Sequence, residues 1–167
     1  EVLLDQKFDA RLIGNIGNPA LSEKMITKRT IFVIEVSSYQ LDYSKIFTSK
    51  YAAILNISHD HIERHKSLKN YIKAKFKLLA SQSNDSIAFV KKNDQLISKK
   101  INNTNLKQKI IKVDLSKINK ILDQIKNKYF LSSGNMENLS FVLKISEILK
   151  LNKEILLKTL NKFNGLK

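Results

Sequence analysis

The chain has 167 residues, of which 43% are hydrophobic, so it can bury a core of its own and is most simply one domain. It contains no cysteine, which excludes disulfide bonds and thiolate metal sites. No apolar run approaches the roughly 20 residues that a transmembrane helix needs, and the first residues do not resemble a signal peptide. We therefore expect a cytoplasmic protein that makes no contact with a membrane.

The formal net charge is +15. Such a charge is typical of nucleic-acid-binding proteins, because lysine clusters neutralise phosphates. Here the excess is almost entirely lysine, scattered along the chain, and the only arginines are Arg11, Arg29 and Arg64. We expect a solvated basic surface and no nucleic-acid partner, and the alternative from another functional class is a basic nucleic-acid-binding module.

Apolar runs alternate with helical patterns along the chain, which predicts βαβ units and an α/β fold with a mostly parallel sheet flanked by helices. Strands are predicted at residues 11–13, 30–36, 51–57, 86–90 and 110–113. Helices are predicted at residues 18–26, 68–81, 93–100, 135–149 and 152–161. The strand at 30–36 is apolar on both faces, so we expect helices to cover it on both sides.

Polar clusters follow three of the predicted strands. Residues 14–17 (GNIG) follow the first strand, Glu35 and residues 37–40 (SSYQ) end the second, and Asn56 with residues 59–61 (HDH) follows the third. In an open α/β sheet, ligands bind beyond the carboxyl ends of the strands, so these clusters are expected to share one site. Each cluster also has an explanation without a site. Residues 14–17 could be a simple turn, Glu35 could pair with a surface lysine, and His59, His61 and His65 could be ordinary loop residues.

One lysine in the predicted helix 68–81 lies on the apolar face of that helix. The apolar face is formed by Leu68, Tyr71, Ile72, Phe76 and Leu79, and Lys69, Lys73 and Lys77 are expected on the opposite face, in water. Lys75 falls within the apolar face. Either its ammonium group reaches the surface past apolar neighbours, or it has a chemical role, because a desolvated amine is more reactive.

Five segments, in this order along the chain, together resemble the Mur ligase family, and its D-glutamate-adding branch in particular. They are residues 14–17 (GNIG), 33–41 (VIEVSSYQL), 55–64 (LNISHDHIER), 71–77 (YIKAKFK) and 134–138 (GNMEN). The resemblance implies the fold of the family's central, P-loop-NTPase-like domain. It also implies an ATP-dependent ligase that joins D-glutamate to UDP-N-acetylmuramoyl-L-alanine through an acyl phosphate, in peptidoglycan synthesis.

The resemblance further implies the roles of individual residues. Glu35, His61 and Lys75 would be the catalytic and Mg²⁺-binding residues, with Lys75 carbamylated by CO₂. Asn138 would contact the adenine of ATP. The UDP-sugar substrate would be held by Asn15, Ser37, Ser38 and Gln40.

The chain also departs from the family pattern. No G-x-x-x-x-G-K-[ST] motif is present, and Gly134 stands where a histidine is common. We therefore expect residues 1–162 to be an N-terminally truncated central domain and residues 163–167 to begin the junction to a further domain. Such a piece is expected to be monomeric and inactive by itself. Within the family, a sister ligase that adds a different amino acid is the alternative, although Tyr39 and Gln40 favour the D-glutamate branch.

Overall fold

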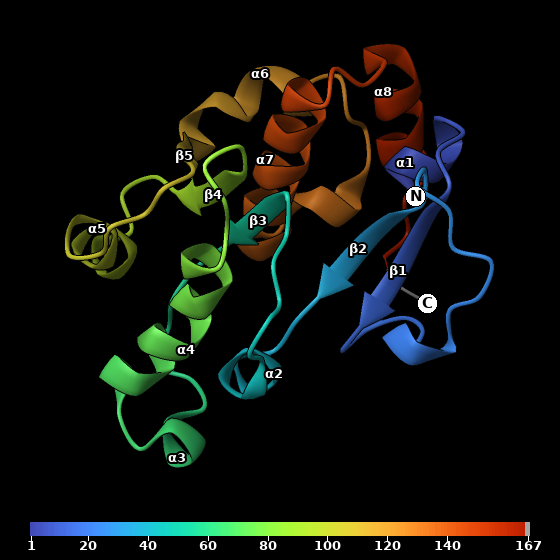
Figure 1. Ribbon diagram of the computed structural model, residues 1–167. Helices are drawn as coiled ribbons and strands as arrows, with labels where there is room; N and C mark the ends of the chain where they lie inside the picture. Colours follow the sequence, from blue (N-terminus) through green and yellow to red (C-terminus); the bar gives the residue numbers. More distant parts are fainter. Residues whose placement is uncertain (166–167) are drawn as a thin grey trace.

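The computed structural model describes residues 1–165, so the last two residues of the expected junction 163–167 lie outside the described residues (Figure 1). The strands are β1 (Ala10–Gly14), β2 (Ile31–Glu35), β3 (Tyr51–Ile54), β4 (Ile87–Lys91) and β5 (Lys109–Val113). The longer helices are α4 (Leu68–Ala80), α5 (Gln95–Asn102), α7 (Ser133–Ile148) and α8 (Lys153–Lys162). Short helices are α1 (Val2–Asp5), α2 (Ser38–Tyr43), α3 (Ile62–His65) and α6 (Asn119–Leu122), with 3₁₀ turns η1 (Ala20–Ser22), η2 (Leu115–Lys117) and η3 (Lys128–Leu131).

All strand pairs of the described residues are parallel, as predicted, but they form two sheets rather than one. β1 pairs with β2, and β3, β4 and β5 form a second sheet in that order. The chain passes from one sheet to the other through α2, which packs against α4. β2 and β3 diverge in Figure 1, and no backbone hydrogen bonds join them in the described part of the chain.

The main core is built around the second sheet, which helices cover on both faces. Ala88 and Val90 of β4 pack with side chains of α4 and α5, whereas Phe89, which points the other way, packs against Phe141 of α7. Phe89 is 0% exposed. Successive side chains of a strand alternate between its faces, so β4 is apolar on both sides because helices cover both sides.

The expectation that β2 is covered on both faces is wrong. Val33 and Ile34, which are neighbours in β2, are 46% and 39% exposed. The physical reason is position, because α4, α5 and α7 pack on the second sheet and β2 pairs only with β1. The covered strand is β4.

The predicted helix at residues 18–26 is also wrong, since only the turn η1 forms there. The Arg11 guanidinium donates hydrogen bonds to the carbonyl oxygens of Lys24 (2.6 Å) and Met25 (3.2 Å) and to the Glu23 carboxylate (3.0 Å). Glu23 is extended (φ −70°, ψ 132°) and Met25 has a left-handed φ of 53°, so the backbone is not helical here. The long-range bonds from Arg11 hold this non-helical segment against β1.

The other predicted helices are confirmed, and side chains cap their starts. Ser67, Ser132 and Asn152 accept hydrogen bonds from backbone amides in the first turns of α4, α7 and α8, respectively. None of the helices that the structure describes has the length and apolar character required to cross a membrane.

Candidate active site

The glycine turn after β1 is fixed against the end of β2. Gly14 and Gly17 have φ angles of 108° and 84°, and an added Cβ would lie 2.2 Å from the carbonyl oxygen of Glu35 and 2.3 Å from that of Leu12, respectively. The amide of Asn15, between them, donates a 2.9 Å hydrogen bond to the Glu35 carbonyl. Glycine is required at both positions, so this turn is more than a generic loop, and it places Asn15 beside Glu35.

Glu35, the last residue of β2, has a carboxylate oxygen with no partner. Its Oε2 is shielded from solvent and makes no hydrogen bond with any described residue. A buried, unpaired carboxylate oxygen is costly, so native proteins rarely keep one without a reason. The carboxylate is therefore suited to a cation or a donor that the protein itself does not supply.

The serines and the glutamine after β2 build the start of α2. The Ser37 hydroxyl accepts from the Gln40 amide (3.2 Å), and the Gln40 side chain accepts from the Ser37 amide (2.9 Å). Ser38 is buried, and its hydroxyl lies 3.0 Å from Nε2 of His65. Ser37 and Gln40 therefore form a capping box, and Ser38 faces the interior. Asn15, by contrast, is exposed to solvent.

His61 lies where the loop after β3 enters α3. Its φ of 55° is left-handed, and its Nδ1 lies 2.9 Å from the Tyr39 hydroxyl. Its Nε2 lies 3.4 Å from Asp60 Oδ2. Tyr39 thus joins the segment after β2 to the segment after β3, which is the meeting of strand ends that the sequence predicts.

Two aromatic rings, those of Tyr39 and Tyr71, lie next to His61, and both also contact His65. Tyr39 stacks on His65 at 5.6 Å between centroids, and Tyr71 of α4 lies 5.5 Å from His65 and 6.2 Å from His61. No separate role was expected for His65, which is buried, or for Tyr71, which the helical periodicity places in the core. Nothing in the spacing of these residues predicts their contacts with one another.

The Lys75 side chain is half-buried and ends at a backbone oxygen. Its Nζ donates a 3.2 Å hydrogen bond to the carbonyl oxygen of Asn56, beyond the end of β3, and lies 4.9 Å from the centre of the Tyr71 ring. Lys73 is exposed, as expected. Lys77 was expected in water, but it pairs with Asp42 of α2 at 3.0 Å, because α2 packs against that side of α4.

Asn138 is exposed near the start of α7, away from these contacts. Its neighbour Glu137 pairs with Lys91 at the end of β4 (2.8 Å), which brings the start of α7 to the carboxyl end of the second sheet. The described residues include no ready-made group of three or more His, Cys, Asp or Glu side chains able to hold a metal ion.

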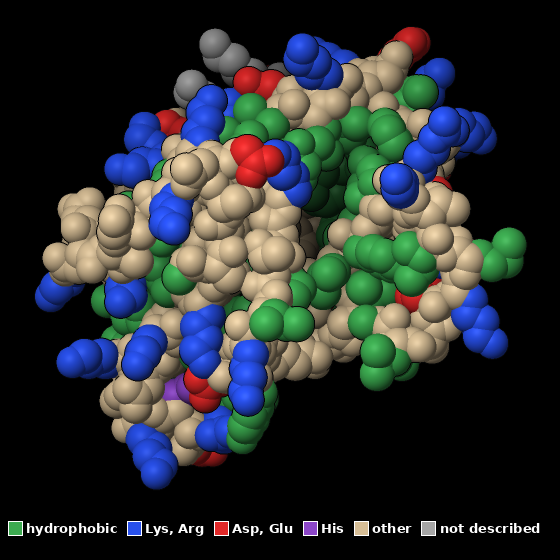
Figure 2. All heavy atoms as spheres, viewed as in Figure 1, with side chains coloured by type: hydrophobic (Ala, Val, Ile, Leu, Met, Phe, Trp, Pro, Cys, Tyr) green, Lys and Arg blue, Asp and Glu red, His purple; other side chains and the backbone are tan. Residues whose placement is uncertain are grey.

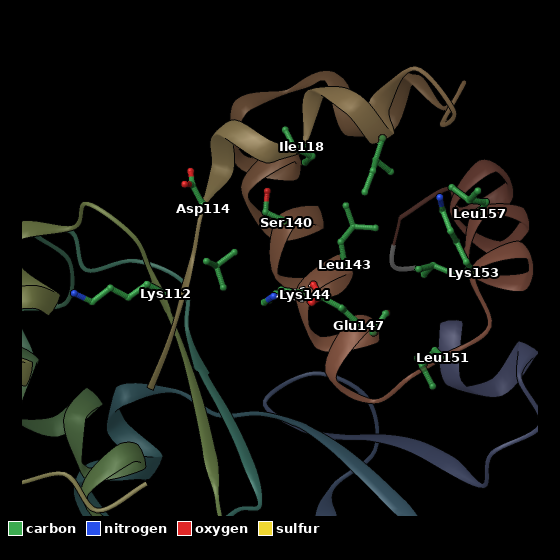
Figure 3. A pocket seen from close by; sticks show the side chains of 14 residues that line it. Lys112, Asp114, Ile118, Ser140, Leu143, Lys144, Glu147, Leu151, Lys153 and Leu157 are labelled. Atoms are coloured by element: carbon green, nitrogen blue, oxygen red, sulfur yellow. Dashed lines mark hydrogen bonds and ion pairs between the residues drawn. The ribbon is translucent and has the colours of Figure 1, made fainter. Parts of the chain in front are cut away.

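Two hollows mark the surface. One, of about 600 Å³, is lined by Tyr39 and residues 59–64 and opens at His61. The other, of about 500 Å³, lies between β5, α6, α7 and α8, with Ile118 and Leu143 on its wall and Lys112 and Lys153 at its rim (Figure 3). No residue predicted for the site lines this second hollow.

The cationic side chains in view are spread over the surface shown in Figure 2 and do not gather into one stripe. At the candidate site, two cationic side chains are engaged within the protein. Lys75 donates to Asn56, and Arg64 lies over the rings of Tyr39 and Tyr43. The absence of a nucleic-acid partner stays a prediction.

Known proteins match this chain along nearly its whole length. The Mur ligase middle domain matches residues 9–159. The UDP-N-acetylmuramoylalanine–D-glutamate ligase of Rickettsia bellii is 29% identical over 99% of this chain and 41% of its own length, and that of Clostridioides difficile is 28% identical over 99% and 40%. The ligase of the same name from Pseudothermotoga lettingae is 33% identical over 96% and 38%, so the chain spans about two fifths of the length of these relatives. Because the family match covers most of the 167 residues, the chain belongs to the Mur ligase family as a middle domain of that family.

Proposed function

We propose that this chain is the central, ATP-handling part of an enzyme that joins D-glutamate to UDP-N-acetylmuramoyl-L-alanine in peptidoglycan synthesis. The observation that carries the proposal is the set of side chains at the ends of β2 and β3. Glu35 has an unpaired buried oxygen, Tyr39 engages His61, and Lys75 turns toward Asn56. The names of the relatives support the choice of amino acid.

Glu35, His61 and Lys75 would hold Mg²⁺. An ammonium group repels a cation, so Lys75 would act after its neutral amine adds CO₂ and loses a proton, which leaves an anionic carbamate with two oxygens. Mg²⁺ prefers oxygen ligands, and the unpaired Oε2 of Glu35 fits that preference. When bound, Mg²⁺ would offset negative charge as a phosphoryl group passes from ATP to the substrate carboxylate.

The remaining proposed residues differ in what they offer a ligand. Asn15 and Asn138 are exposed, so their amides can bind the UDP-sugar and adenine, respectively. Gln40 is also exposed, but its amide oxygen accepts from the Ser37 amide, so its NH₂ group is what it can offer the UDP-sugar. Ser37 and Ser38 are engaged within the protein, so they would support the substrate site by holding α2 in place. The amine of D-glutamate would then attack the phosphorylated carboxylate and release phosphate.

The test is a ligation assay with the complete product of the gene. Phosphate release from ATP should require both UDP-N-acetylmuramoyl-L-alanine and D-glutamate. The 167-residue chain, which has no G-x-x-x-x-G-K-[ST] motif, should give no turnover. Turnover with L-lysine or meso-diaminopimelate and the matching UDP-muramoyl dipeptide, but not with D-glutamate, would assign the protein to a sister ligase. Tight DNA binding without any ligation would instead favour the nucleic-acid alternative.

A further inference from the structure

Tyr39 makes the only hydrogen bond to the His61 ring among the described residues. The hydroxyl lies 2.9 Å from Nδ1. On the other side of the ring, Asp60 Oδ2 is 3.4 Å from Nε2 but does not form a hydrogen bond with it. Nε2 is therefore the nitrogen left open for an outside partner.

Tyr39 is itself held firmly. Its ring stacks on His65 at an interplanar angle of 29°, and the guanidinium of Arg64 lies 5.9 Å from the ring centre. His65 is buried and fixed by Ser38. A chain of contacts thus runs from the protein interior through His65 and Tyr39 to His61.

His61 has little else to hold it. Its side chain is 44% exposed, and it begins a helix of only four residues from a left-handed backbone conformation. An exposed imidazole in such a place would rotate between several orientations and exchange its proton between the two nitrogens. A contact that fixes both the ring and its tautomer changes what the ring can bind.

We propose that Tyr39 is a positioning residue that holds His61 with its proton on Nδ1 and its Nε2 lone pair free for a divalent cation. The Nδ1–H donates to the Tyr39 hydroxyl oxygen. Histidines that bind metals through one nitrogen usually donate the other N–H to a fixed acceptor, and this pair has that arrangement. The inference rests on the proposed role of His61 and adds the residue that prepares it.

The tautomer can be measured in the 167-residue chain by long-range ¹H–¹⁵N NMR of the imidazole rings at about pH 8.5, where imidazoles are neutral. The chain has three histidines, and a His61→Gln variant assigns the His61 signals. The wild type should show the Nδ1–H form. Tyr39→Phe should lose it and give the mixture of an unconstrained ring.

Tyr43→Phe is the matched control. It also removes a tyrosine hydroxyl from α2, but that hydroxyl contacts Arg64 and not His61. It should leave the His61 tautomer unchanged. An Nε2–H form in the wild type, or the same spectrum in Tyr39→Phe, would overturn the proposal.

A second measurement uses the complete enzyme. Tyr39→Phe should raise the Mg²⁺ concentration for half-maximal activity about 10-fold, with a smaller effect on kcat at saturating Mg²⁺. A fall in kcat with unchanged Mg²⁺ dependence would refute the positioning role. Failure of the proposed ligase function would appear instead as no D-glutamate ligation by the wild type, which leaves the tautomer result as it stands.

Discussion

The ammonium group of Lys75 ends 3.2 Å from the carbonyl oxygen of Asn56, so a residue in the middle of α4 contacts the segment just beyond β3. The Lys75 Nζ also lies over the Tyr71 ring, 4.9 Å from the ring centre. The group is thereby held at the end of a strand, where ligands bind in this type of fold.

Replacing Lys75 by alanine in the complete enzyme should nearly abolish ligation. Added acetate or formate should partly restore activity, because a small carboxylate supplies the oxygens of the lost carbamate. A lysine that only packs would predict a stability change of about 1 kcal/mol and no loss of chemistry. The measurement is the ligation rate with and without carboxylate, and Lys73→Ala, at an exposed position of the same helix, is the control. Substantial activity of Lys75→Ala without any additive would exclude the carbamate.

Glu35→Gln should raise the thermal midpoint of the metal-free chain, because it removes a charge from a buried, unpaired oxygen. The free energy of unfolding should rise by about 1 kcal/mol. Ligation by the complete enzyme carrying the same change should fall sharply. Glu23→Gln is the contrasting variant and should lower the midpoint, since Glu23 has a partner in Arg11 at 3.0 Å. Thermal unfolding followed by circular dichroism measures the direction of both changes in midpoint. A large loss of stability in Glu35→Gln would show that the Glu35 carboxylate stabilises the fold.

Gly17→Ala should destabilise the chain by about 2 kcal/mol, because the positive φ and the nearby Leu12 carbonyl both oppose a Cβ. Gly134→Ala is the matched control. Its Cβ would meet nothing within 4 Å and it lies in α7, so alanine should stabilise by about 0.5 kcal/mol. Urea unfolding at equilibrium measures both. Equal stabilities of the two variants would contradict the tight turn at Gly17.

Acid should destabilise the protein between about pH 4 and pH 2. The Lys50 ammonium, 2.6 Å away, lowers the pKa of Asp85 from 3.8 to about 2, and Lys92 does the same for Asp114. A carboxyl group whose pKa is lower in the folded state stabilises the fold above its unfolded pKa. That contribution is lost as the pH falls through the folded value. The Asp85→Asn variant should therefore show a shallower loss of thermal midpoint than the wild type between pH 4 and pH 2, and parallel curves would refute the pairing.

Much of the fold could be predicted because its elements follow from local patterns. The periodicity of α4 and the apolar run of β4 are read directly from the sequence, and both form where expected. The segment after Pro19 could not be predicted this way, because its backbone is extended at Glu23 and left-handed at Met25, and its hydrogen bonds reach Arg11, 13 and 14 residues away. The exposure of β2 could not be predicted, because the apolar sequence of a strand does not show on which sheet the helices pack.

The candidate site was predictable in part for a similar reason. Strand ends mark where ligands bind, so Glu35, His61 and Lys75 could be named from position and resemblance. Tyr39 was noted only as part of a motif, and its contact with His61 depends on how α2 and α3 meet. Such a contact between two short helices leaves no periodic trace in the sequence.

The division of the strands into two sheets implies that amide hydrogen exchange is uneven across the molecule. Amides of β4, which has a paired strand on each side and helices over both faces, should exchange only when the whole chain unfolds. Amides of β2 have one neighbouring strand and exposed side chains, so they should exchange through local opening at a much lower free energy. Glu35 lies at the end of this less protected pair and Lys75 on a helix packed against the protected sheet, so each local opening of β2 would displace Glu35 while Lys75 stays in place.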